Sequence, residues 1–132
     1  RDTFEKNTVF DLKTIIKIAL QLSSTMAHMH KQGISHGDVY AHNTMINDDG
    51  KVLFGDFGAA TNLVTLPILQ QEAMAAIEVR ALGCLMYDLL PLMNAKPCPA
   101  ANTLVQLKDD AMQPNLALRP RFSEIHRILK TL

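Results

Sequence analysis

The chain has 132 residues, of which 48% are hydrophobic and 20% are charged, and its 13 Lys and Arg residues balance 13 Asp and Glu residues. This length fits one compact domain, and the apolar fraction supplies a core, which excludes an intrinsically disordered chain. The net charge of zero gives no support to nucleic-acid or anionic-membrane binding through a basic surface. Seven Met and no Trp favour a mainly helical core.

Cysteine content and hydropathy favour a soluble cytoplasmic protein. The two cysteines, Cys84 and Cys98, are too few for a disulfide scaffold, so we expect both thiols to be free. No apolar stretch reaches the roughly 18 residues of a membrane span, and no signal segment opens the chain, so we expect no membrane partner. The chain begins at Arg1 rather than at Met, and we expect a missing part upstream of it.

In the first half of the chain, apolar residues recur every three or four positions between Asp11 and Gln32, which predicts one long amphipathic helix. Asp11 is a suitable N-cap, and Gly33 is a suitable C-terminal stop. Two short β-like segments, Thr44–Ile46 and Val52–Phe54, then flank an Asn-Asp-Asp-Gly turn sequence. We therefore expect a small β-hairpin after the first helix.

The second half of the chain is predicted to be helical. An apolar helical pattern runs over residues 73–90 and stops at a proline, and residues 94–102 have the composition of a loop. A further helix is predicted over residues 103–112, and a last one from Ser123, which is a plausible N-cap. No repeat or linker interrupts residues 1–132, so we expect one domain.

The residues that carry chemistry lie on both sides of the predicted hairpin. His-Gly-Asp-Val-Tyr-Ala-His-Asn occupies residues 36–43, and Asp-Phe-Gly occupies residues 56–58. Asp38, Asn43 and Asp56 supply the hard oxygen ligands that Mg²⁺ prefers. Phosphoryl transfer needs such groups, because most of its catalysis is positioning and neutralisation of charge by Mg²⁺.

Four motifs in order resemble the C-terminal lobe of a protein kinase. Residues 36–43 match its catalytic loop, residues 56–58 match its Asp-Phe-Gly motif, and Glu-Val-Arg-Ala-Leu-Gly at 78–83 resembles the start of its large buried helix. Arg119-Pro120 resembles its late Arg-Pro. The amino-acid sequences of these motifs are similar to those of the kinase-like domains attached to leucine-rich repeats in bacterial proteins. The resemblance implies a mainly α fold in which a small hairpin carries the catalytic and metal-binding loops.

The resemblance also implies roles for single residues. Asp38 would be the catalytic base for the attacking hydroxyl, and Asn43 and Asp56 would hold Mg²⁺ against the phosphates of ATP, with Asn43 also counted as catalytic. His36 would pack under the loop as a structural residue. An N-terminal lobe with the glycine-rich loop and the strand Lys would precede residue 1, and the acceptor would be a protein or small-molecule hydroxyl.

Simpler interpretations stand beside these roles. Asp38, Asn43 and Asp56 are each also suitable for an Asx turn, because their side chains bind nearby backbone N–H groups. His42 fits a polar loop residue better than a ligand, because no metal partner is visible in the sequence. The helical histidines, including His30, are expected to be exposed or satisfied in place.

Two substitutions within the catalytic motif leave the function open. Gly37 replaces the Arg that receives an activating phosphate in many kinases, and Tyr40 replaces a Lys that stabilises the transferred phosphoryl group. The chain is then either an active phosphotransferase or a pseudokinase used as a binding module. The His-Gly-Asp wording also resembles small-molecule kinases such as the aminoglycoside and choline kinases, which gives a third alternative.

The segment after Asp56 is short and has no Ala-Pro-Glu motif. The Glu of that motif normally pairs with the late Arg, so Arg119 needs another partner, and Glu72 is the candidate. Glu78 is expected to tie the start of the buried helix to the backbone of the catalytic loop, and its alternative is a Glu that only complements the helix dipole. The platform that docks a peptide substrate is expected to be missing.

Overall fold

The structure is a computed structural model that describes residues 10–36, 44–46, 52–54, 61–93 and 96–132. The predicted mainly helical fold is confirmed. Within these residues, the α-helices are α1 (Leu12–Lys31), α2 (Ile68–Leu89), α3 (Pro99–Ala111) and α4 (Phe122–Leu129). Its short strands are β1 (Ile34–Ser35), β2 (Thr44–Ile46), β3 (Val52–Phe54) and β4 (Thr61–Asn62). Three single-turn 3₁₀ helices connect them: η3 (Leu63–Thr65), η4 (Leu90–Leu92) and η5 (Leu116–Leu118).

Helix α1 begins and ends as the sequence predicts. The Asp11 carboxylate accepts a 2.7 Å hydrogen bond from the N–H of Thr14, which satisfies one of the unpaired donors of the first turn. At the other end, Gly33 has a φ of +77°, a left-handed conformation that favours glycine. A side chain there would also meet Val64, because an added Cβ would lie 2.7 Å from its Cγ2.

Replacing Asp11 by alanine is expected to lower the melting temperature modestly at neutral pH. Hydrogen bonds from the side chain and backbone of Thr14 hold the pKa of Asp11 below its usual value. The stabilisation by this cap is therefore present above about pH 4 and is lost as the pH falls through the lowered pKa. Melting curves of the wild type and Asp11→Ala should differ near neutral pH and converge in strong acid. A difference in melting temperature that stays the same at every pH would contradict the capping role of the carboxylate.

The strands form two antiparallel ladders. The β2–β3 pair lies, in sequence, between the two strands of the β1–β4 pair. In the predicted hairpin β2–β3, which is confirmed, Thr44 pairs with Phe54 and Ile46 with Val52. Outside it, Ile34 and Ser35 of β1 pair with Asn62 and Thr61 of β4. The N–H of Leu63 also donates a 2.6 Å hydrogen bond to the carbonyl of Gly33. The chain that leaves α1 is thus joined to the chain that enters α2.

Helix α2 begins at Ile68, five residues before the predicted start, so the prediction of its N-terminus is wrong. Pro67 occupies the N-cap position, where its missing N–H costs nothing. The side-chain amide of Gln71 donates a 2.8 Å hydrogen bond to the carbonyl of Leu66. The exposed residues of the first turn have no amphipathic pattern that would reveal the helix. Its C-terminus at Leu89 lies one residue from the prediction.

The last two α-helices also begin earlier than predicted. Helix α3 starts at Pro99, because Cys98 acts as N-cap, with its Sγ 3.5 Å from the N–H of Ala101. The predicted loop over residues 94–102 therefore ends before Pro99, because residues 99–102 belong to α3. Helix α4 starts at Phe122, and Ser123 is therefore not its N-cap. Phe122 is buried in the core, and this packing sets the start of the helix.

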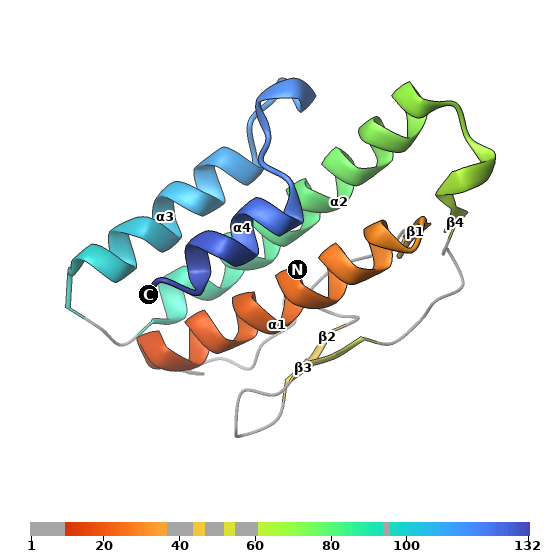
Figure 1. The fold of residues 1–132 in the computed structure, drawn as a ribbon. Helices are drawn as coiled ribbons and strands as arrows, with labels where there is room; N and C mark the ends of the chain where they lie inside the picture. Colours follow the sequence, from red (N-terminus) through yellow and green to blue (C-terminus); the bar gives the residue numbers. More distant parts are fainter. Residues whose placement is uncertain (1–9, 37–43, 47–51, 55–60, 94–95) are drawn as a thin grey trace.

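The helices pack around one core (Figure 1). Helix α1 lies against α2 and α4, α2 lies against α3, and the β2–β3 hairpin lies beside α1. The most buried side chains of this core are Ile15, Ile18, Leu22, Met26, Leu82, Leu85, Met86, Leu89, Leu104, Phe122, Ile125 and Leu129. The spacing of those on α1 confirms the predicted apolar stripe.

Gly83 lies at the contact between α2 and the C-terminal end of α3. A Cβ added to it would lie 2.7 Å from Cγ of Met112 and 3.0 Å from Cβ of Ala111, which is closer than packed atoms approach. Glycine is therefore required by the close approach of the two helices rather than by backbone conformation.

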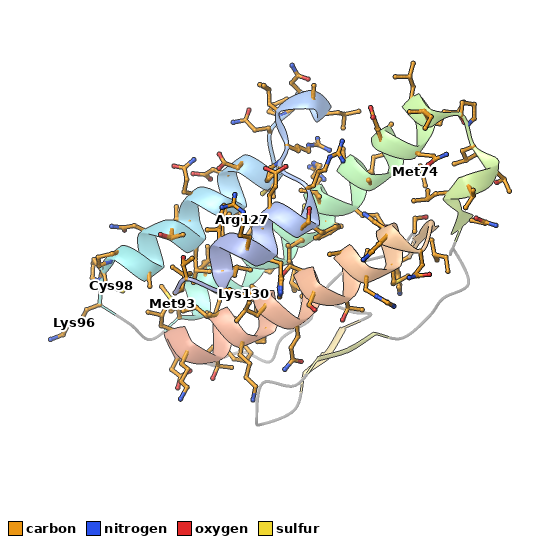
Figure 2. The ribbon with its side chains drawn as sticks, viewed as in Figure 1. Met74, Met93, Lys96, Cys98, Arg127 and Lys130 are labelled. Atoms are coloured by element: carbon orange, nitrogen blue, oxygen red, sulfur yellow. The ribbon has the colours of Figure 1, made fainter. Side chains whose placement is uncertain are left out.

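Both cysteines are free, as predicted. Cys84 is buried in α2, and Cys98 lies at the start of α3 (Figure 2). Within the described residues, no helix combines the length and the apolar character that crossing a bilayer requires.

Candidate functional site

The predicted catalytic and metal-binding residues Asp38, Asn43 and Asp56 lie outside the described residues, and so do Gly37 and Tyr40. Their roles stay predictions. The described residues next to them are His36, which precedes Asp38 by two positions, and the hairpin β2–β3. The candidate site is therefore built from what holds these neighbouring residues in place.

Glu78 of α2 joins the end of β1 to helix α1. Its Oε1 accepts a 3.0 Å hydrogen bond from the backbone N–H of His36 and lies 2.8 Å from Nε2 of His30. Glu78 and His36 are 3% and 0% exposed, so these contacts are made away from water. Burying a carboxylate costs free energy of folding unless its oxygens accept hydrogen bonds. Burying a backbone N–H is likewise costly unless it donates one. The three residues therefore stabilise one another.

This arrangement confirms the predicted contact between Glu78 and the backbone of the catalytic loop. The predicted reason was in part wrong, because Glu78 lies in the middle of α2 and not at its start. Its alternative role as a charge that complements the helix dipole is excluded, since that effect is confined to the first turn. Burial and the bond to His36 account for the acidic residue at this position.

His30 is a positioning residue that the sequence did not reveal. Its ring contacts the Phe122 ring edge-on, with centroids 5.2 Å apart, and this packing directs Nε2 toward Glu78. The prediction that this histidine is satisfied in place is confirmed. Only the three-dimensional contact with α2 distinguishes it from the exposed His28 of the same helix.

Arg119 binds backbone carbonyls in place of a carboxylate. Its Nε donates a 2.6 Å hydrogen bond to the carbonyl of Gln113, and its Nη1 donates a 3.0 Å bond to the carbonyl of Ala76. Between the described side chains, no ion pair joins Arg119 to Glu72, so that predicted pairing is wrong. Burial, and then the positive charge of Arg80, lower the pKa of the Arg119 guanidinium. Arginine nevertheless stays protonated in proteins.

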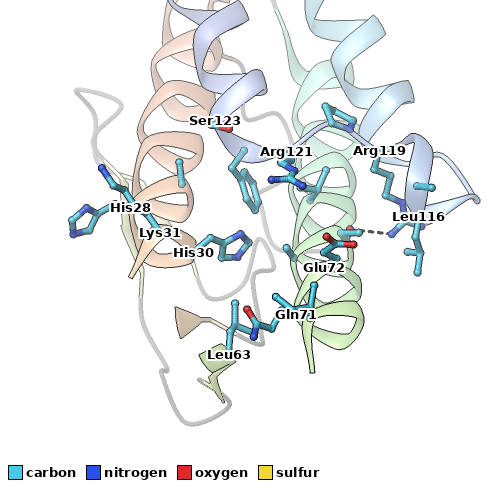
Figure 3. A pocket seen from close by; sticks show the side chains of 18 residues that line it. His28, His30, Lys31, Leu63, Gln71, Glu72, Leu116, Arg119, Arg121 and Ser123 are labelled. Atoms are coloured by element: carbon cyan, nitrogen blue, oxygen red, sulfur yellow. Dashed lines mark hydrogen bonds between the residues drawn. The ribbon is translucent and has the colours of Figure 1, made fainter. Parts of the chain in front are cut away.

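A pocket of about 810 Å³ lies between the end of α1, the first half of α2 and the turn that enters α4 (Figure 3). His30, Glu72 and Arg119 all line it. The pocket therefore lies beside the Glu78–His36 contact, on the part of the lobe where α2 begins earlier than predicted.

Comparison with known proteins decides the family. Residues 1–129 match the family "Protein kinase domain". The chain belongs to the protein kinase family. The match covers nearly the whole chain, from the N-terminal segment to the last residue of α4, so the kinase resemblance of the four motifs is confirmed.

Similar kinases come from plants and animals. The chain is 35% identical to the serine/threonine/tyrosine-protein kinase HT1 of Arabidopsis thaliana, over 68% of this chain and 28% of that protein. It is 26% identical to the serine/threonine-protein kinase Nek3 of Mus musculus, over 68% and 21%. It is 27% identical to the MAP3K epsilon protein kinase 1 of Brassica napus, over 81% and 10%. The chain thus spans less than a third of the length of each of these kinases.

Within this kinase lobe, the described geometry explains how the catalytic loop is approached. Strand β1 runs into His36, the first residue of the matched catalytic loop, and the buried carboxylate of Glu78 holds its backbone. The two ladders then bring the chain back to η3 and α2.

Proposed function

We propose that this chain is the helical lobe of a phosphotransferase that moves the γ-phosphate of ATP to a hydroxyl acceptor with the help of Mg²⁺. The observation that carries the proposal is the buried contact between Glu78 and the backbone of His36, in a chain that matches the protein kinase domain. A structural carboxylate at this place fixes the start of the segment that carries Asp38.

Three residues have named roles in the proposed reaction. Asp38 orients the acceptor hydroxyl and accepts its proton as the hydroxyl oxygen bonds to the γ-phosphorus, while the bond from that phosphorus to the β–γ bridging oxygen breaks and ADP leaves. Asn43 directly precedes β2 and Asp56 follows β3 by two positions, and their oxygens suit Mg²⁺. Asn43 and Asp56 would hold the metal, which would neutralise charge on the phosphates of ATP.

The proposal requires partners beyond this chain. An N-terminal lobe upstream would complete the ATP cleft, and the acceptor would be a protein or a small molecule with a hydroxyl group. The free cysteines agree with a cytoplasmic location, which stays a prediction. The resemblance to kinase-like domains of bacterial leucine-rich-repeat proteins also stays a prediction.

Replacing Asp38 by alanine in the full-length protein is expected to lower turnover about 10²- to 10⁴-fold, because the reaction loses its general base. The measurement is ATP-dependent phosphoryl transfer to generic acceptor proteins and to a panel of hydroxyl metabolites. Asp109→Ala is the matched control, since Asp109 is an exposed residue of α3 whose only described pairing is with Lys108. Equal turnover by Asp38→Ala and Asp109→Ala would contradict the role of Asp38.

A pseudokinase that acts as a binding module is the second candidate. Its support is the course of the chain after the hairpin, where α2 begins at Ile68 and Arg119 binds carbonyls in place of a motif Glu. The segment between Phe54 and Ile68 has few residues with which to form the usual platform for a peptide substrate. Absence of turnover on every acceptor by the full-length wild type would favour this candidate, and turnover on metabolites alone would favour a small-molecule kinase.

A further inference from the structure

The pocket beside α2 has the size and lining of a binding site. Its volume of about 810 Å³ lies within the range of about 300–1,000 Å³ that ligand pockets occupy. Small or apolar side chains from four elements form much of its wall: Ala27, Leu63, Ala75, Ala76, Val79 and Phe122. A bulky apolar side chain of a ligand would find there the contacts that alanine leaves unmade.

Among the described residues that line the pocket, the charged side chains are mainly positive (Figure 3). Lys31 comes from the last turn of α1, and Arg119 and Arg121 come from the turn before α4. Among the described residues that line it, Glu72 is the one carboxylate. Basic groups from two elements, together with an apolar wall, complement a ligand that combines acidic and apolar groups.

Arg119 and Arg121 keep donors for such a ligand. Two N–H groups of Arg119 bind carbonyls, and a guanidinium has five, so others remain for a carboxylate. The Arg121 side chain is exposed at the N-cap of α4, where it makes no capping bond, and the first N–H groups of α4 add a positive field.

Apolar side chains on the rim of the pocket are exposed to water. Ile68 at the start of α2 is 68% exposed, and Leu116 of η5 is 41% exposed. Large exposed apolar side chains next to a hollow are typical of protein interaction sites.

We propose that this pocket docks an acidic peptide segment of a partner protein, with an apolar side chain against the alanine-rich wall and carboxylates beside Arg121 and Lys31. The complementary charge, the pocket volume and the exposed rim are its three independent supports. The proposal does not depend on phosphoryl transfer, and it applies equally to an active kinase and to a pseudokinase.

The test is fluorescence polarisation with the full-length protein and a short labelled peptide in which glutamates flank a Leu-Phe pair. Saturable binding is expected, and a matched peptide with glutamines in place of the glutamates should bind about tenfold more weakly, as expected for lost charge-assisted bonds. Arg121→Gln should weaken binding of the acidic peptide by a similar factor. Ala75→Trp, which fills the pocket without changing charge, should abolish it.

Arg127→Gln is the matched control, because Arg127 is an exposed arginine of α4 outside the pocket lining (Figure 2). It should bind the peptide like the wild type, and circular dichroism should show that all variants keep their helices. Three results would overturn the proposal: no saturable binding, an equal loss in Arg121→Gln and Arg127→Gln, or dimerisation of the wild type that Arg121→Gln abolishes. The last result would assign the pocket to a second copy of the chain.

Discussion

Replacing Glu78 by alanine is expected to lower the free energy of unfolding by about 1–3 kcal/mol, because the buried N–H of His36 loses its acceptor. His30 loses its partner in the same step. In the full-length protein, the loss of this anchor should also lower phosphoryl transfer, since His36 precedes Asp38 by two residues. The measurements are urea unfolding and turnover of the same preparations.

Two further substitutions make the Glu78 prediction specific. Glu78→Gln keeps a carbonyl oxygen that accepts from His36, so its loss of stability should be smaller than that of Glu78→Ala. Glu72→Ala removes an exposed carboxylate from the same helix and should change stability little. If Glu78→Ala and Glu72→Ala unfold at the same urea concentration, the anchor does not stabilise the fold.

Replacing Gly83 by valine is expected to destabilise the protein by about 1–3 kcal/mol, as overpacking of a core does. The added Cβ would lie 2.7 Å from Cγ of Met112 and 3.0 Å from Cβ of Ala111, so the Met112 side chain or the end of α3 must shift. Valine is a better helix former than glycine, and an observed loss of stability therefore arises from the helix contact.

The Gly83 prediction has a rescue and a control. Met112→Ala removes the nearest side-chain atom and should restore part of the stability in the double variant, since the two positions share one contact. Gln70→Val places the same side chain at an exposed position of α2 and should be almost neutral. A Gly83→Val protein as stable as the wild type would show that the interface opens without cost.

Helix α1 and the β2–β3 hairpin could be predicted because local rules determine them. The cap at Asp11, the stop at Gly33 and the apolar stripe between them agree with each other, and such consistent signals specify one structure. The starts of α2 and α4 could not be predicted in this way. The start of α4 depends on burial of Phe122, which is a tertiary contact. The start of α2 is marked locally only by Pro67, and the exposed residues that follow it have no amphipathic pattern.

A contact in the candidate site could be predicted where it belongs to a recognised sequence motif. It could not be predicted where it forms only because the fold brings distant residues together. Motif resemblance led from Glu78 to the catalytic-loop backbone, and the structure contains that bond. Neither the role of His30 nor the carbonyl partners of Arg119 follows from sequence spacing, because each contact joins elements that are more than forty residues apart or lies in an irregular turn. Glu72, the candidate partner for Arg119, was wrong for the same reason.

The ladder β1–β4 makes residues 36–60 an insert between two helices. Ile34 and Ser35 pair with Asn62 and Thr61, so the ends of the insert are held together at its base. The buried core cluster of the described residues is drawn from the four helices outside it. Doubling the length of such a closed segment costs only about 0.6 kcal/mol. Substitutions inside this segment that keep the Glu78–His36 contact are therefore expected to leave the helical core folded.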